Sequence, residues 1–186
     1  MRKCGDCTLC CKLLPVRELA KKGGEKCRYQ RHHKGCSVYG KAQMPLCCSL
    51  WNCRWLTEDR TQDLRRPDRS GYVIDVMPDF VTVRNDLTGD FMHIPVLQVW
   101  VDPLRKDDWE TDEALFAYVE RLGREEKMAA LIRFGEEKAT FIAPPAVNPE
   151  GKWFRHDSSV GGPTHTATDF IKAGLEMKFV VEAPVI

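Results

Sequence analysis

The sequence predicts an α+β protein in which an irregular N-terminal cysteine lobe packs on a small, mainly antiparallel sheet with one main helix. Two observations carry this prediction. All nine cysteines of the 186-residue chain lie between Cys4 and Cys53, and none occurs in the 133 residues that follow. Segments rich in Val, Ile and aromatic residues, which are typical of strands, begin only at Tyr72. We therefore expect a lobe at residues 1–56 and an α+β body at residues 57–186, which can also form one compact unit with the lobe.

The lobe is expected to contain little regular structure. Glycines and prolines interrupt it often, and only residues 13–22, around Pro15, can make a short helix. So short a segment has little apolar material for a core of its own. Bound metal would supply the missing cross-links, as it does in small zinc modules that unfold without their ion.

The body begins after a polar connector at residues 57–70. Its first three strands should be antiparallel, because Pro78-Asp79 and Thr88-Gly89-Asp90 supply turn signals between them. The three segments are Tyr72 to Met77, Phe80 to Asn85 and Phe91 to Val101.

The main helix should follow these strands. Thr111 is predicted to cap it, and Gly123 is predicted to end it. Its first turn carries Asp112 and Glu113, which suit the positive end of the helix dipole. The apolar side chains that are expected to face the sheet are those of Leu115, Phe116, Val119 and Leu122.

Two further strands are expected from Met128 to Phe134 and from Lys138 to Ile142, joined as a hairpin through Gly135-Glu136-Glu137. Pro144-Pro145 should end the ordered pattern. Residues 148–168 have the composition of a loop, and residues 170–181 fit either a strand or a short helix.

Composition places the chain among soluble globular proteins. It has 43% hydrophobic and 30% charged residues, and no apolar run approaches the roughly 18 residues of a membrane span. Met1-Arg2-Lys3 leads into the cysteines with no apolar signal segment, so we expect a cytoplasmic protein without a membrane partner. A disulfide framework is disfavoured, because nine is an odd number and the compartment is expected to be reducing. Unrelated buried thiols would not crowd into the first third of the chain.

Charge is divided unevenly along the chain. Residues 1–60 hold 13 Lys or Arg and 5 Asp or Glu, a net charge of +8, and the remainder carries −7. Nearby cations favour thiolate over thiol. Eight thiolates that held two divalent ions would lower the charge of this region to +4, which weakens the case for a nucleic-acid partner. The cations expected to stabilise thiolates are Lys3, Lys12, Lys26, Arg28, Lys34 and Arg54.

The spacing of the cysteines points to metal coordination. The run opens as Cys4-x2-Cys7-x2-Cys10-Cys11, and a two-residue gap lets one tight turn present two sulfurs to an ion at about 2.3 Å. Together with Cys27, Cys36-Ser37-Val38-Tyr39, Pro45-x2-Cys48 and Cys53-Arg54-Trp55-Leu56, this run resembles the YkgJ-type cysteine-cluster family, which is described as a zinc- or iron-chelating domain. The resemblance covers residues 4–56.

The resemblance implies metal chelation and a ligand set, without a reaction. Met44 and Ser49 stand where the family pattern has arginine, and Cys47 is an extra thiol outside that pattern. The implied metal ligands are Cys4, Cys7, Cys10, Cys11, Cys27, Cys36, Cys48 and Cys53.

Eight thiolates suffice for two closed four-sulfur sites or for one cluster with bridging sulfurs. Zinc is preferred as the cofactor over iron or an iron–sulfur cluster, because the Cys-Pro that ends a ferredoxin motif is missing. His32 and His33 lie between Cys27 and Cys36 in sequence and are candidate additional ligands, although exposure is the simpler interpretation.

Catalysis finds little support. An all-cysteine shell is usually closed, whereas a catalytic zinc site keeps an open position, and no nucleophile elbow, phosphate loop or dinucleotide fingerprint is present. We therefore expect a metal-binding protein whose partner is the metal ion. The alternatives are an iron–sulfur or multinuclear iron enzyme and a zinc-stabilised module that binds nucleic acid or an unknown protein.

Overall fold

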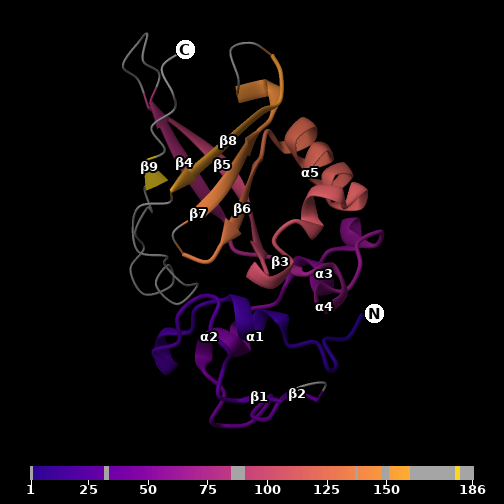
Figure 1. Cartoon of the computed structure of the whole chain (residues 1–186), viewed down its shortest axis with the longest axis vertical. Helices are drawn as coiled ribbons and strands as arrows, with labels where there is room; N and C mark the ends of the chain where they lie inside the picture. The colour runs from indigo at the N-terminus through magenta and orange to yellow at the C-terminus, as the bar shows by residue number, and fades with distance from the viewer. Residues whose placement is uncertain are drawn as a thin grey trace.

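The structure is a computed structural model, and it describes residues 2–31, 34–84, 91–136, 138–147, 151–159 and 179–180. The predicted α+β class is confirmed. A seven-stranded sheet forms the body, a long helix covers one of its faces, and the cysteine lobe lies at one end of the sheet (Figure 1).

The cysteine lobe contains only short elements, as its glycines and prolines predict. The helix expected within residues 13–22 is shorter than predicted: after Pro15 only the 3₁₀ turn η1 (Arg17–Leu19) forms, because the backbone is extended at Leu14 and left-handed at Ala20. The lobe also contains α1 (Leu9–Leu13), the paired strands β1 (Gln30–Arg31) and β2 (Gly35–Cys36), α2 (Leu46–Leu50) and α3 (Arg54–Thr57).

The connector at residues 57–70 has more structure than predicted. It contains the 3₁₀ turn η2 (Asp59–Thr61) and the one-turn helix α4 (Pro67–Ser70). Pro67 occupies the first turn of α4, where its missing N–H costs nothing, and Gly71 ends the helix with a left-handed backbone.

The sheet has the order β8-β7-β6-β5-β4-β9, and β3 also pairs with β5. Most pairs are antiparallel, as expected, but β5–β6 and β4–β9 are parallel. The connection from β5 to β6 runs through the main helix, which is how parallel neighbours are joined. The strands are β3 (Tyr72–Ile74), β4 (Asp79–Arg84), β5 (Phe91–Val101), β6 (Ala129–Phe134), β7 (Lys138–Ala143), β8 (Phe154–Ser159) and β9 (Phe179–Val180).

The described residues near the end of the chain form two strands, β8 and β9. Strand β8 lies within residues 148–168, which were predicted to be loop, and it pairs with β7 along its whole length. Of residues 170–181, only β9 is described, and it is a strand; the rest lies outside the described residues. The sequence signal for β8 is weak because its polar residues give no apolar alternation.

The main helix, α5 (Glu113–Glu126), begins and ends differently from the prediction. Asp112, not Thr111, caps it, because the Asp112 carboxylate accepts a hydrogen bond from the Leu115 amide at 3.2 Å. The helix continues through Gly123, where an added Cβ would lie 2.4 Å from the Trp153 ring. Gly123 therefore permits close packing and does not end the helix. The remaining 3₁₀ turns are η3 (Pro103–Arg105), η4 (Asp108–Thr111) and η5 (Pro145–Val147).

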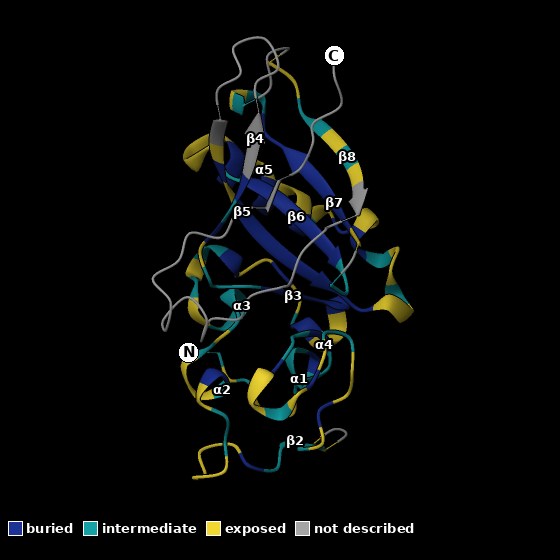
Figure 2. Ribbon diagram, turned by 90° about the vertical axis from the view of Figure 1, so that its left-hand side faces the viewer, coloured by how far each residue is buried: buried dark blue, intermediate teal, exposed yellow. Residues whose placement is uncertain are grey.

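The two faces of the sheet bury different side chains. On the first face, Leu115, Val119 and Leu122 of α5 pack on alternate residues of β3, β5 and β6. Phe116, predicted to join them, is 38% exposed. Alternation along β5 places Val96, Gln98 and Trp100 on the second face. Figure 2 shows the buried sheet above a lobe in which most residues are half-buried or exposed.

The lobe joins the second face of the sheet at the end of β5. Leu9 and Leu13 of α1 pack against Val73 and Trp100. Lys12 forms an ion pair with Asp102 at 2.7 Å. These contacts fix α1, and with it Cys10 and Cys11, against the sheet. Among the residues that the structure describes, no helix has the length and apolar character needed to cross a bilayer.

Candidate metal centre

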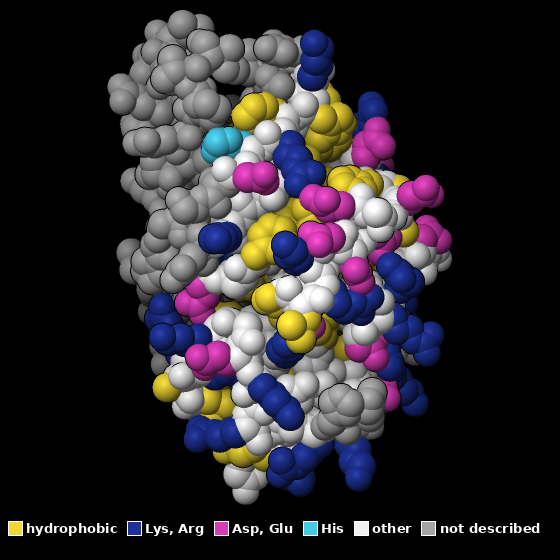
Figure 3. All heavy atoms as spheres, in the orientation of Figure 1, with side chains coloured by type: hydrophobic (Ala, Val, Ile, Leu, Met, Phe, Trp, Pro, Cys, Tyr) yellow, Lys and Arg dark blue, Asp and Glu magenta, His cyan; other side chains and the backbone are white. Residues whose placement is uncertain are grey.

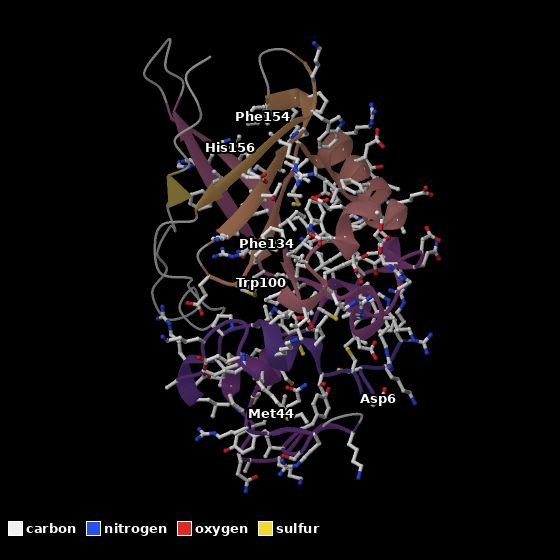
Figure 4. All side chains as sticks on the ribbon, viewed as in Figure 1. Asp6, Met44, Trp100, Phe134, Phe154 and His156 are labelled. Carbon is white, nitrogen blue, oxygen red and sulfur yellow. The ribbon has the colours of Figure 1, made fainter. Side chains whose placement is uncertain are left out.

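A cavity of about 1190 Å³ lies between the lobe and the sheet, and all nine cysteines line it. One wall is formed by Val73, Asp75, Gln98 and Trp100 of the body, and the opposite wall includes Tyr39 of the lobe. In Figure 4, Trp100 lies where the sheet meets the lobe and Met44 lies deeper in the lobe. The cavity therefore gathers, in one space, cysteines that lie up to 49 residues apart in sequence.

Short elements bring the cysteines to this cavity. A turn joins the first two, since the Cys7 amide donates to the Cys4 carbonyl at 3.1 Å. Helix α1 carries Cys10 and Cys11, and the Cys27 amide donates to the Cys11 carbonyl at 3.1 Å. Strand β2 carries Cys36, α2 carries Cys47 and Cys48, and Cys53 precedes α3.

The nine thiols are all free, with Cys27 and Cys47 buried and the others half-buried. Within the described part of the chain, no three His, Cys, Asp or Glu side chains already stand in a geometry that would hold a metal ion. The donors fit a thiophilic metal in kind and number. Coordination thus requires the sulfurs to converge from the cavity walls by movement of the short lobe elements.

Neighbouring thiols are electrostatically coupled. A hydrogen bond from the Cys10 thiol lowers the pKa of Cys11 to about 7, aided by the Lys21 ammonium, and raises the pKa of Cys10. Burial first, and then the neighbouring thiols of Cys7 and Cys53, raise the pKa of Cys4 to about 11. Cys11 is therefore the thiol most readily ionised near neutral pH, and it can offer a metal its first anionic ligand.

Cys47 differs from the eight predicted ligands. Its sulfur lies 3.9 Å from that of Cys48, and its amide donates to the Glu18 carboxylate at 3.1 Å. The hydrogen bond to Cys48, followed by burial and Glu18, raises the pKa of Cys47, and the same hydrogen bond lowers the pKa of Cys48. Cys47 is thus hydrogen-bonded to the Cys48 sulfur, although it also lines the cavity.

The cations that lower the pKa of thiols in the structure, Lys21 and Arg66, are not among those named from the sequence. Lys21 is buried, donates to the Lys12 and Lys22 carbonyls at 3.1 Å and lowers the pKa of Cys11. Arg66 lowers the pKa of Cys4 and Cys7.

Two of the six cations named from sequence have other partners in the structure. Lys12 pairs with Asp102, and Arg54 bonds Glu58 at 2.9 Å and the Asp75 carbonyl. Lys3 and Lys34 do line the cavity. Arg66 could not be selected from the sequence, because it lies thirteen residues after the last cysteine.

The sheet wall contributes polar residues that no sequence motif marks. The Asp75 carboxylate accepts hydrogen bonds from the Trp51 indole at 2.7 Å and from the Met77 amide at 2.9 Å, and burial raises its pKa. Asp75 lies in the break between β3 and β4, which both pair with β5. This interrupted pairing places the Asp75 carboxylate in the cavity wall.

Behind this wall lies a buried polar network. The Gln98 amide donates to Asp79, and the Arg133 guanidinium, which is fully buried, donates to Gln98 at 3.4 Å and lies 4.6 Å from the centre of the Trp100 ring. Burial lowers the pKa of Arg133 to about 10. The network draws on strands β4, β5 and β6, and its Arg133 packs against Trp100.

Asp79 should make stability depend on pH. Burial raises its pKa to about 6, so the folded state holds a proton that the unfolded chain releases above about 4. Stability from this group is present below pH 4 and is lost as the pH rises towards 6, by up to about 3 kcal/mol. Urea unfolding with chelator present should show that Asp79→Asn flattens this decline. An unchanged decline in the variant would contradict the assignment.

Of the histidines that the structure describes, neither His93 nor His156 lines the cavity. His32 and His33 lie outside the described residues. His93 is exposed and meets the Phe80 ring edge-on, and His156 stacks on Phe154 along β8 at 6.1 Å (Figure 4). His156 was predicted to lie in a loop, so its place on a strand is a correction.

No family model, curated protein or solved structure matches this chain.

Proposed function

We propose that the protein binds metal through the cysteine lobe, with Cys4, Cys7, Cys10, Cys11, Cys27, Cys36, Cys48 and Cys53 as ligands. The observation that supports this most strongly is the single cavity lined by every cysteine of the chain. Thiolates converge on zinc, or on iron in sulfur clusters, more readily than on hard cations such as Mg²⁺. Zinc is the preferred ion, and the resemblance to the YkgJ-type family is part of this proposal.

A lobe built around metal would explain how so little apolar material stays ordered. Its longest helices have five residues and its strands two. Helices this short are unstable alone. Metal–thiolate bonds would link α1, β2 and α2 across the cavity and replace the core that the lobe lacks.

Cobalt titration tests the proposal. Under anaerobic, reducing conditions, Co²⁺ should give the intense visible bands of tetrahedral thiolate coordination, and Zn²⁺ should abolish them by displacement. Weak bands typical of oxygen ligands, or no saturation, would contradict thiolate binding.

Substitution of single cysteines distinguishes the proposed ligands from Cys47. Cys7→Ser should weaken zinc binding by more than the 10- to 100-fold that loss of an outer partner costs. Cys47→Ser is the matched control, because serine keeps a hydrogen-bond donor beside Cys48, and it should change affinity by less than about 10-fold. Competition with a fluorescent zinc chelator measures both. Equal losses would make Cys47 a ligand as well.

One observation favours an iron–sulfur or multinuclear iron enzyme as a second candidate. The cavity is larger than closed tetrahedral sites require, and the buried Asp75 lines it. An open position and a carboxylate are features of catalytic metal sites. Anaerobic purification decides between the two, since an iron–sulfur protein is coloured and a zinc protein is not.

Basic side chains favour a third, weaker candidate, a zinc-stabilised module that binds nucleic acid or protein. Lys and Arg side chains gather over the lobe on the face shown in Figure 3. Binding to nucleic acid would weaken steeply with salt, and salt-independent or absent binding would exclude it.

A further inference from the structure

The eight proposed ligands are distributed around the cavity in two sets. In the first set, the Cys4 sulfur lies 3.7 Å from the Cys7 carbonyl oxygen, and Cys7, Cys10 and Cys53 all pack against the cluster that contains Val73 and Trp100 of the sheet. Cys7 and Cys53 are also the thiols with the largest electrostatic effect on Cys4. This set is therefore held against the body.

The second set is built around the β1–β2 hairpin. Backbone hydrogen bonds link the Cys27 amide to the Cys11 carbonyl and the Gln30 amide to the Cys27 carbonyl, at 3.1 and 3.0 Å. Gln30 is the partner of Cys36 in the hairpin. The thiols that act on Cys36 are those of Cys11, Cys27 and Cys48. This set therefore lies on the side of the cavity away from the sheet.

The two sets meet at adjacent cysteines of α1. Cys10 and Cys11 are neighbours on this helix, and their thiols are hydrogen-bonded to each other. Successive residues of an α-helix are rotated by about 100° from one another, so the surroundings of the two residues differ. Cys10 faces the apolar cluster of the first set, and the Cys11 backbone bonds to Cys27 of the second.

Buried or half-buried cations act on thiols of both sets. Arg66 acts on Cys4 and Cys7, and it is held by Asp6 at 2.8 Å and Asp68 at 2.6 Å. Lys21 acts on Cys11, Cys27 and Cys48 of the second set and also on Cys10 of the first. Four thiolates around one divalent ion carry a net charge of −2, which an adjacent cation partly neutralises.

We infer that the lobe holds two separate four-cysteine metal centres, an inference that rests on the proposed function. The centre beside the sheet uses Cys4, Cys7, Cys10 and Cys53. The centre beside the hairpin uses Cys11, Cys27, Cys36 and Cys48. Cys47 is hydrogen-bonded to Cys48 and belongs to neither centre.

Native mass spectrometry of the full chain, saturated with zinc and then exposed to a limiting chelator, tests this arrangement. The wild type and the matched control Cys47→Ser should retain two ions. Cys53→Ser and Cys36→Ser should each retain one, because each removes a ligand from a different centre. Loss of both ions from either variant, or a single ion in the wild type, would overturn the two-centre arrangement.

Alkylation of the wild type gives a second measurement that needs no variant. During stepwise removal of zinc, thiols should become reactive in two blocks, and peptide mapping should assign four of the proposed ligands to each block. Simultaneous exposure of all eight would indicate one shared cluster and contradict the inference while leaving metal binding intact. A wild-type chain that binds no zinc would overturn the inference and the proposed function together.

Discussion

Removal of metal should unfold the cysteine lobe and leave the sheet folded. In small zinc modules the bound ion contributes about 10 to 16 kcal/mol of apparent binding free energy at neutral pH, and that energy is also folding energy. The lobe has no apolar core that could stabilise it to the same extent, since its buried apolar side chains are few. The body keeps its own core on both faces of the sheet.

Hydrogen exchange resolves the two parts. After chelation, amides between Cys4 and Cys53 should exchange much faster, while those of β5 and β6 keep their protection. Added zinc should restore the original pattern. Unchanged protection in the lobe would contradict a metal-dependent fold, and loss of protection along the whole chain would show that lobe and body unfold together.

Substitution of Trp100 should lower both the free energy of unfolding and the affinity for zinc. Trp100 is 3% exposed and contacts α1 on one side and Arg133 on the other. Trp100→Ala should cost about 3 to 5 kcal/mol of unfolding free energy, as large truncations in cores do. It should also weaken zinc binding, because it removes the surface against which Cys7, Cys10 and Cys53 pack.

Trp109 provides a matched control. It is 1% exposed but belongs to the core beneath α5, away from the cavity. Trp109→Ala should lower stability by a similar amount and leave zinc affinity within about 3-fold, as expected for independent sites. Urea unfolding and chelator competition measure the two quantities. If Trp100→Ala does not fold, Trp100→Phe keeps the core filled. It should still weaken zinc binding, but by a smaller factor than Trp100→Ala. If Trp100→Ala and Trp109→Ala weakened zinc binding equally, Trp100 would have no specific role in the metal site.

The sequence identified the strands of the body where apolar residues alternate or run together, as in β5. It missed β8, because a polar strand has no such pattern, and it placed the helix cap at Thr111, because Thr and Asp compete at adjacent positions and only the backbone decides between them. The parallel pairing of β5 with β6 could have been inferred from the intervening helix.

The cysteines could be selected from sequence because chemistry and spacing mark them directly. The supporting residues could not be. Lys21 and Arg66 act on the thiols, and Asp75 lines the cavity, through tertiary contacts, and nothing in their local sequence separates them from other charged residues. Arg133 is a comparable case, since a fully buried arginine on a central strand contradicts the usual preference for the surface.

Elemental analysis of protein purified anaerobically without added metal tests thiolate chelation most directly. We expect zinc or iron in whole-number stoichiometry to the chain, with zinc preferred, and loss of that metal in a variant with Cys7 and Cys36 both replaced by serine. Wild-type protein that carries no metal, and that takes up neither zinc nor iron when titrated in the reduced state, would contradict the account.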